Sequence, residues 1–280
     1  MQSSLNQLPP TETEKPIVRT IASTETTHTD LKRAGGVGAV RNYMGAPGSL
    51  EAGPQAFLVE RPYPNPRVAP HFHDIDQFQV ITAGDGRMGK KEVKPITFQY
   101  ADADTPYGPI IGRDNGISFF TLRAVASGGY FAMPGSRHHM PGRAGRNIAA
   151  TFDIERDSLP AHDVMREPLM EPEADGVYAE GLRLGAHAST TGVTPDAGCQ
   201  YYLVCTGSLI QNGKALPANS LIHVDAGEDT PQLQAGPEGA NVLVMQFPRP
   251  SDRPGSDPAK LANRSMDDYH KVPANPKGSN

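Results

Sequence analysis

The sequence is poor in cysteine. Of its 280 residues only Cys199 and Cys205 are cysteines, and they lie at either end of an apolar stretch that favours a strand. Six residues of strand separate two side chains by about 20 Å, too far for a disulfide, and two cysteines are too few for a structural zinc site. We therefore expect two small, buried or half-buried thiols, as in proteins of the reducing cytoplasm.

An excess of basic charge, a membrane segment and an export signal are also missing. The chain has 26 Lys and Arg residues against 31 Asp and Glu, a net charge of −5, and no basic block, which argues against nucleic acid and anionic membranes as partners. No apolar run approaches the ~18 residues of a membrane helix. The start, MQSSLNQLPPTETEKP, lacks a basic segment followed by an apolar one. We expect a cytoplasmic protein.

Long helical patterns are absent, whereas glycine and proline are abundant. The 29 glycines and 27 prolines make up one residue in five, which disfavours long helices and suits short strands joined by turns. Short runs rich in β-branched and aromatic residues, mostly bounded by Gly, Pro, Asp or Asn, indicate strands instead. The predicted strands are 56–60, 77–83, 96–101, 117–124, 147–154, 181–188, 200–207, 220–226 and 241–247. The chain is therefore predicted to be all-β.

Composition divides the chain into a polar N-terminal extension (1–50), two strand-rich segments (51–130 and 176–248), a connection between them (131–175) and a Pro-rich tail (249–280). Both ends are polar and lack a sustained period, so they cannot offset the entropy of their own ordering unless they lie across another surface. We expect both ends to be irregular. Any part of them that is ordered should lie across the body of the protein or across a neighbouring subunit.

An internal repeat relates the two strand-rich segments. Gln77 and Gly84 enclose six residues, and so do Gln200 and Gly207, at an offset of 123. Other matches at nearly this offset are Gly89-Lys90 with Gly213-Lys214, Asp102 with Asp225, Thr105-Pro106 with Thr230-Pro231, and 117–124 with 240–247. Two copies of one β unit explain these matches together, and each copy has about the number of strands that a small barrel needs.

The first copy contains a pair of histidines with the spacing of metal ligands. His71 and His73 are two residues apart, so on an extended strand both rings project from the same face. A turn over 74–76 lets the next strand begin at Gln77, whose side chain can return to that side. Two imidazoles and a carbonyl oxygen suit a divalent ion such as Fe, Mn, Zn or Ni. The alternatives are a pair that binds substrate directly, or the remnant of a lost site.

This spacing resembles a known family. His71-x-His73, three residues, Gln77, six residues and Gly84 is similar to the first motif of the cupin superfamily, where most members have Glu in place of Gln77. The second cupin motif, usually Pro-x-Gly-x-x-His, is approximated by 106–111. Together with the repeat, the resemblance implies a bicupin of two tandem jelly-roll (double-stranded β-helix) barrels. Cupins include dioxygenases, isomerases, lyases, hydrolases, storage proteins and sensors, so the fold does not name the reaction.

Two residues depart from the cupin pattern. Ile111 occupies the place of the third histidine, which puts the standard four-ligand site in doubt. Gln77 offers a neutral ligand where most cupins have an anionic one, so a bound dication would keep more of its charge and favour Lewis-acid chemistry. Some cupin lyases and hydrolases resemble this sequence in using Gln.

Polar residues of the first copy could complete a site. Asp102, Asp104 and Tyr107 are expected beside the mouth of the first barrel, where Tyr107 could orient an oxygen-bearing substrate and a carboxylate could act as a base. The ordinary alternative is a turn, since Asp and Pro-Tyr-Gly are good turn formers. Gln79, in phase with Gln77, should also point inward, and two inward Gln residues imply a polar, hydrated pocket.

The remaining histidines have weaker patterns. The pair at 138–139 lies in a Gly- and Arg-rich connection, which reads as a solvated loop or as a segment folded over a barrel mouth. His187 and His223 have no partner two residues away and are expected to be packed or surface residues. The second copy has Thr194 and Asp196 where the first has its histidine pair, so it is expected to be free of metal.

Three functions remain open on this basis. The first is a metal-dependent enzyme acting on a small oxygenated organic substrate, with dioxygenase chemistry favoured because it is common among bicupins. The second is a non-redox lyase, isomerase or hydrolase in which Mn, Zn or Ni acts as a Lewis acid and Asp102 or Tyr107 moves protons. The third is a binding or sensor protein without catalysis. Because barrels of this kind expose strand edges, we also expect a homodimer.

Overall fold

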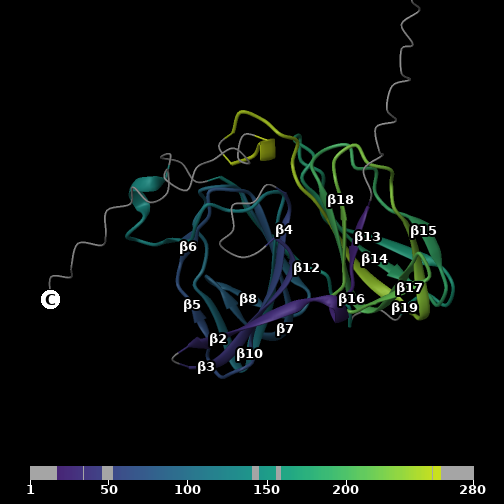
Figure 1. Ribbon diagram of the computed structural model, residues 1–280, viewed down its shortest axis with the longest axis horizontal. Coiled ribbons are helices and arrows are strands. Elements are labelled where there is room, and N and C mark those ends of the chain that lie inside the picture. Colours follow the sequence, from purple (N-terminus) through teal and green to yellow (C-terminus); the bar gives the residue numbers. More distant parts are fainter. Residues whose placement is uncertain are drawn as a thin grey trace, which may run out of the picture.

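The computed structural model describes residues 18–33, 35–45, 53–140, 145–155, 159–253 and 255–259, and they form two antiparallel sheets that build two barrels (Figure 1). The first barrel contains β2 (Thr27–Arg33), β3 (Gly36–Met44), β4 (Gln55–Arg61), β5 (Arg67–Val68), β7 (Gln77–Met88), β8 (Lys91–Val93), β9 (Thr97–Ala101), β10 (Ile110–Arg123) and β12 (Asn147–Thr151). The second contains β1 (Arg19–Ile21), β13 (Val164–Met170), β14 (Tyr178–Leu184), β15 (Ser189–Thr191), β16 (Gln200–Gln211), β17 (Lys214–Pro217), β18 (Leu221–Val224) and β19 (Gln232–Gln246).

Smaller elements complete the fold. A two-stranded sheet joins β6 (His71–Phe72) to β11 (Phe131–Ala132), and two short 3-10 helices are η1 (Ser23–Glu25) and η2 (Arg137–His139). All the strands predicted from the sequence are confirmed, from 56–60 within β4 to 241–247, which overlaps the end of β19. In the part of the chain that the structure describes, no helix is long and apolar enough to cross a membrane.

The repeat is confirmed by the order of the strands. The first sheet runs β12-β9-β7-β10-β4-β3-β2, and the second runs β1-β18-β16-β19-β14-β13. β7 and β10, paired in the first barrel, correspond to β16 and β19, paired in the second, and the hairpin strands β8 and β17 pair with β7 and β16 alike. The two copies therefore share one topology, as the offset of 123 residues predicts.

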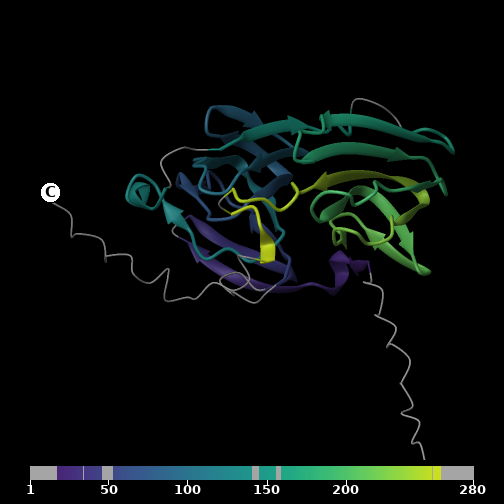
Figure 2. The same ribbon diagram turned by 90° about the horizontal axis from the view of Figure 1, so that it is seen from above.

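The N-terminal extension differs from the expectation of an irregular segment. β1 pairs with β18 of the second barrel, opposite His223, whereas β2 and β3 join the sheet of the first barrel beside β4. Figures 1 and 2 show this purple segment passing from one barrel to the other. The physical reason is that β18 and β4 would otherwise present unpaired strand edges. The connection 131–175 is divided in the same way, with β12 in the first sheet and β13 in the second.

Alternation along the strands separates the interiors of the barrels from the core between them. On β7, Phe78 and Val80 face an apolar core shared with the second barrel, where Tyr201, Leu203 and Phe247 lie. The intervening residues of β7 face the interior of the first barrel. A one-residue change in register would exchange these two faces, so burial on both sides specifies the register strongly.

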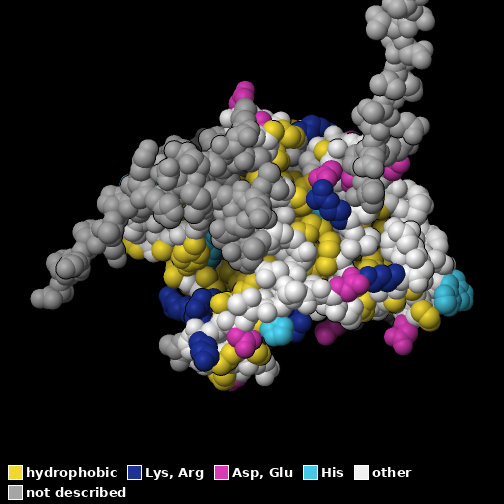
Figure 3. All heavy atoms as spheres, viewed as in Figure 1, with side chains coloured by type: hydrophobic (Ala, Val, Ile, Leu, Met, Phe, Trp, Pro, Cys, Tyr) yellow, Lys and Arg dark blue, Asp and Glu magenta, His cyan; other side chains and the backbone are white. Residues whose placement is uncertain are grey.

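Charged side chains are scattered over the surface. On the face shown in Figure 3, the acidic and basic side chains of the described residues lie interspersed with uncharged ones.

Both cysteines are free: Cys199 is buried and Cys205 half-buried. Burial raises the pKa of the Cys205 thiol to about 12, so it stays protonated and unreactive at neutral pH.

Candidate functional site

The structure brings the two histidines of the first barrel together. His71 lies in β6, where its backbone exchanges hydrogen bonds with Tyr107, at 3.1 and 3.0 Å. The rings of His71 and His73 lie 5.1 Å apart, and the His71 ring stacks on Tyr130 at 4.3 Å. Extended backbone around Phe72 places both rings on one side, since alternate residues share a face.

A directed chain of hydrogen bonds connects three of the predicted site residues. Arg123 can only donate, and its Nε and Nη2 both lie 3.3 Å from Gln77 Oε1. This contact orients the amide so that Gln77 Nε2 donates to the Tyr107 hydroxyl (2.5 Å), which in turn donates to His71 Nε2 (2.8 Å). His71 Nδ1 then carries a hydrogen and donates it to the Ala69 carbonyl, 2.8 Å away. The chain therefore has a single direction of donation, set by the arginine.

Burial keeps the histidines and the tyrosine of this group uncharged. It lowers the pKa of His71 to about 4 and that of His73 well below its usual range, and the positive charge of Arg123 acts in the same direction on both. Burial likewise raises the pKa of Tyr107, so its hydroxyl keeps its proton. His73 Nδ1 donates to the Gly129 carbonyl at 2.5 Å, which leaves its Nε2 with a free lone pair.

Arg123 is the residue of this hydrogen-bonded group that sequence reasoning missed. Its side chain is buried at the end of β10, its Nη1 donates to Gln55 Oε1 at 2.5 Å, and its guanidinium lies 5.5 Å from the ring of Phe57. Burial lowers its pKa to about 10, which still leaves it charged at neutral pH. A signal existed in the sequence: Arg123 ends the apolar run ISFFTLR in phase with Thr121, on the face that points into the barrel.

A second polar layer lies deeper in the first barrel. Gln79 faces Thr121 on one neighbouring strand and Gln99 on the other. All three are buried, yet Gln79 Oε1 and Gln99 Nε2 have no hydrogen-bond partner among the described residues. Buried polar atoms are nearly always paired with protein or water, so unpaired ones indicate a polar interior that accommodates water or a ligand. The predicted inward orientation of Gln79 agrees with this register.

The donor set does not fit a divalent metal as it is arranged here. Gln77 Oε1, the only atom of that side chain suited to a metal, accepts hydrogen bonds from Arg123, and the lone pair of His71 Nε2 accepts one from Tyr107. Ile111, at the place of the third histidine, supplies no ligand atom. Among the described residues, no group of three or more His, Cys, Asp or Glu side chains is placed to hold a metal. A dication bound to neutral ligands beside a guanidinium would also be repelled by it.

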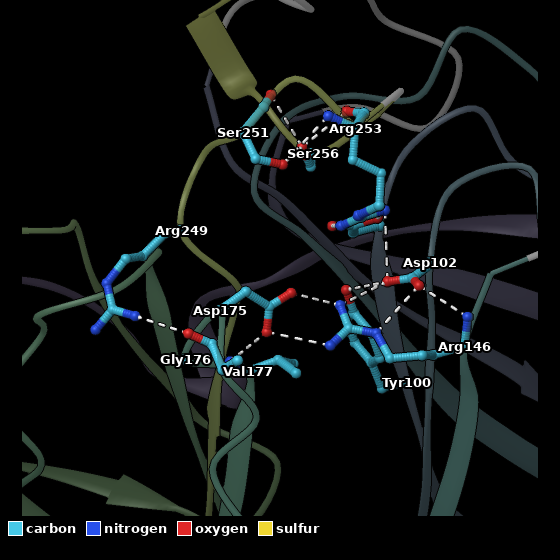
Figure 4. A network of polar contacts seen from close by, with 12 residues as sticks. Tyr100, Asp102, Arg146, Asp175, Gly176, Val177, Arg249, Ser251, Arg253 and Ser256 are labelled. Atoms are coloured by element: carbon cyan, nitrogen blue, oxygen red, sulfur yellow. Dashed lines mark hydrogen bonds and ion pairs between the residues drawn. The ribbon is translucent and has the colours of Figure 1, made fainter.

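Asp102 is not brought to this group. Its position follows from alternation: Ala101 is the register partner of Gln77, so Asp102 lies on the opposite face, with Tyr100. Its carboxylate accepts hydrogen bonds from the Tyr100 hydroxyl (2.8 Å) and from Arg146 Nη2 (3.0 Å), and Arg146 also pairs with Asp175 of the second half (Figure 4). Although burial raises the pKa of Asp102, hydrogen bonds from Arg146 hold it below its usual value.

The C-terminal segment joins this network. Arg253 pairs with Asp76 through two hydrogen bonds of 2.8 and 2.5 Å and approaches Asp102 at 3.4 Å (Figure 4). Asp76 also accepts a hydrogen bond from the backbone of Ala103. The part of the tail around Arg253 is therefore fastened to the loop that precedes Gln77.

The other polar candidates have structural surroundings. Asp104 has a left-handed backbone (φ 57°), and its N–H donates to the His73 carbonyl at 2.7 Å, as in an ordinary turn. His138 is exposed in η2, and His187 is exposed in a left-handed turn. His223 is buried against the ring of Tyr201, 4.9 Å away.

The second barrel is closed where the first is polar. Gln200, which corresponds to Gln77, donates to Gln246 Oε1 (2.7 Å) and accepts from the Tyr202 hydroxyl (2.9 Å). Gln246 corresponds to Arg123 and donates to a backbone carbonyl, so no cation takes part in this network. The layer that corresponds to Gln79, Gln99 and Thr121 consists of Tyr202, Ile222 and Val244, all fully buried. Thr194 and Asp196, at the positions of the histidine pair, are exposed.

Comparisons with known proteins identify the fold. Neither a scan against models of protein families nor a search of curated proteins finds a match. Among solved structures, the chain is similar to a candidate dioxygenase of Nostoc punctiforme (11% identity, TM-score 0.56, 81% of each chain covered). It is also similar to the procruciferin 11S globulin of Brassica napus (11%, 0.56, covering 84% of this chain and 86% of that one). A third is the salicylate 1,2-dioxygenase of Pseudaminobacter salicylatoxidans (13%, 0.51, covering 86% and 88%). These likenesses show the fold, two tandem jelly-roll barrels, which is the fold implied by the resemblance of the motif around His71 to the cupins.

Proposed function

We propose that the protein is an enzyme that binds a small oxygenated organic molecule inside the first barrel and transfers a proton on it. The observation that carries this proposal is the directed chain from Arg123 through Gln77 and Tyr107 to His71. Beside it lies a layer with unpaired amide atoms at Gln79 and Gln99, whereas in the second barrel the equivalent Gln200 is held by Gln246 and Tyr202.

Each group has a role in this proposal. Arg123 and the inner glutamines bind the oxygen atoms of the substrate and exclude water from it. The Tyr107 hydroxyl donates a hydrogen bond to His71 Nε2, 2.8 Å away. A substrate that displaces this bond can receive the proton of Tyr107 Oη or give one of its own protons to the lone pair of His71 Nε2. Isomerisation, elimination and hydrolysis need such a proton transfer and no redox partner. His73, with its Nε2 lone pair free, is placed to accept a hydrogen bond from the substrate.

A second candidate is a metal-dependent dioxygenase. Two observations favour it: both histidines donate Nδ1–H to backbone carbonyls, which leaves Nε2 as the coordinating atom that metal sites use, and two of the similar solved structures are named as dioxygenases. His71, His73 and Gln77 would hold the ion, which would supply a site for O₂ and substrate oxygens. This would require Gln77 to turn its oxygen away from Arg123.

Exchange of substrate protons in D₂O tests the proposal. A panel of enolisable ketones, β-diketones and phenols is followed by proton NMR for enzyme-catalysed exchange, and in parallel by an oxygen electrode after loading with Fe(II). We expect the wild-type protein to catalyse exchange. Tyr107→Phe should lower the rate of exchange by about 100-fold, within the range of acid–base contributions. The matched change Tyr202→Phe in the second barrel should leave the rate unchanged. Oxygen uptake that depends on Fe(II) and on His71 would favour the second candidate. Equal exchange in wild type and Tyr107→Phe would contradict the proposal.

A further inference from the structure

Arg123 is a buried cation whose hydrogen-bond partners are all neutral. The residue is 5% exposed, and its three side-chain hydrogen bonds go to the amide oxygens of Gln55 and Gln77. Within the described ranges no carboxylate forms an ion pair with it, and the negative charge of Asp74 acts on it only from beyond ion-pair distance. Arg183, another deeply buried arginine, shows the usual arrangement, with Glu167 Oε2 at 3.0 Å. A buried charge is costly unless it is paired, so the site of Arg123 calls for an anion in direct contact with the guanidinium.

The guanidinium retains the hydrogens that an anion needs. Its three bonds use one hydrogen on each of its nitrogens, and each terminal nitrogen carries a second. Two parallel N–H groups bind a carboxylate in the bidentate geometry that Arg favours. An organic carboxylate is therefore the anion whose chemistry the arginine matches best.

The deeper layer adds a second recognition element. Gln79 and Gln99 face each other across two neighbouring strands and are 3% and 6% exposed. Gln79 Oε1 lacks a donor and Gln99 Nε2 lacks an acceptor. A hydroxyl is the small group that can satisfy both at once, by donating to the first and accepting from the second. Gln79 lies one layer beyond Gln77 on β7, so carboxylate and hydroxyl sites are adjacent.

We propose that the first barrel binds a small hydroxycarboxylate, with the carboxylate on Arg123 and the hydroxyl on Gln79 and Gln99, and that the arginine takes the place of a metal ion. The inference rests on the proposed function, whose substrate class it names. It also explains Gln77: a glutamate there would neutralise Arg123 and compete with the ligand, whereas the amide holds the arginine in place and leaves its charge free.

Calorimetric titration of the full-length protein, dialysed against EDTA, tests this inference. The probes are lactate, malate and mandelate, each paired with its neutral amide, and elemental analysis accompanies each sample. At least one carboxylate should bind more tightly than its amide by 10-fold or more, equally well with and without added Mn²⁺ or Zn²⁺. Arg123→Lys should weaken binding at least 10-fold, since it keeps the charge but loses the bidentate geometry. Arg183→Lys, a matched change at the paired arginine, should leave it unchanged.

Gln77→Glu keeps the test decisive if Arg123→Lys does not fold, because it places a carboxylate against the arginine and should abolish carboxylate binding. Carboxylate binding that requires a stoichiometric metal and is lost in His71→Ala would overturn the inference and leave the proposed site in place. Binding of the neutral amides without the carboxylates, weakened by Tyr107→Phe, would likewise overturn the inference and leave the proposed site in place. Absence of binding for every probe at 20 mM (roughly the limit of weak affinity by this method), or binding that none of these variants changes, would overturn the inference. Proton exchange sensitive to Tyr107→Phe in the same sample would show that the proposed function survives it.

Discussion

Replacing Gln77 with glutamate tests whether Arg123 lacks a counter-charge, and the repeat provides a matched control at Gln200. Both glutamines are buried at the start of equivalent strands, so both substitutions bury a carboxylate. In the first barrel the new carboxylate meets a guanidinium at about 3.3 Å. In the second it meets only the Gln246 amide and the Tyr202 hydroxyl.

The expected free energies follow from these contacts. A buried carboxyl group can avoid the desolvation penalty of its charged form by binding a proton. For a group with an ordinary pKa near 4.3, binding that proton at pH 7.5 costs about 4 kcal/mol. This value is therefore the upper limit of the penalty for burying the carboxyl group. Attraction between charges about 4 Å apart returns about 4 kcal/mol at an effective dielectric constant of about 20. The free energy of unfolding of Gln77→Glu should therefore lie within about 1 kcal/mol of wild type, whereas Gln200→Glu should lose about 4 kcal/mol.

Urea unfolding at pH 7.5 measures the difference, read as a shift in midpoint at constant slope. The two variants should differ by about 4 kcal/mol in the free energy of unfolding, with Gln77→Glu the more stable. Equal losses in both would refute the reasoning, because they would show that Arg123 is already neutralised by another group.

Other consequences can be measured directly. The pKa of His223 is lowered to about 4 by burial, with Asp225 opposing the shift. Between pH 4 and 6.5 the unfolded chain therefore binds more protons than the folded one. The free energy of unfolding should fall as pH falls through that window, by about 2 kcal/mol at pH 5. In urea unfolding, His223→Gln should reduce this dependence of stability on pH. Arg253→Ala should cost about 2 kcal/mol because it leaves the buried Asp76 carboxylate without its ion pair, whereas Arg249→Ala, at an exposed neighbour, should be near neutral; equal losses would contradict this. The homodimer stays a prediction, and sedimentation equilibrium showing a monomer would refute it.

The fold was predictable because its signals are local and repeated. β7 and β16 each begin with a glutamine, continue with β-branched or aromatic residues, contain a glycine seven residues after that glutamine and recur at one offset. Each of these features is present in the sequence without knowledge of pairing. The strands β1 to β3 carry no such signal. The register partner of β1 lies far along the chain, in β18. β2 pairs with its neighbour β3 but is largely exposed, so its composition is that of a polar tail.

The site was predictable only in part, for the same reason. His71, His73, Gln77 and Tyr107 are tied to one motif and one turn, and the structure brings them together. Arg123 joins them through the pairing of β10 with β7 and β4, which no local pattern reveals. Asp102 was assigned to the barrel mouth from its nearness in sequence to Tyr107, but the two-residue period of β9 turns it to the face between the halves.

The path of the N-terminal segment has a consequence for how the molecule can be divided. A fragment cut at the repeat boundary and comprising 51–175 would lose β2 and β3 and bare the edge of β4. The complementary fragment would lose β1 and expose the edge of β18. The two copies therefore differ in how they can be separated, although their topology is the same. A fragment of 27–155 keeps every strand of the first sheet, whereas no contiguous fragment that omits the first barrel contains both β1 and β18. The second barrel alone would have to be rebuilt by grafting β1 onto it.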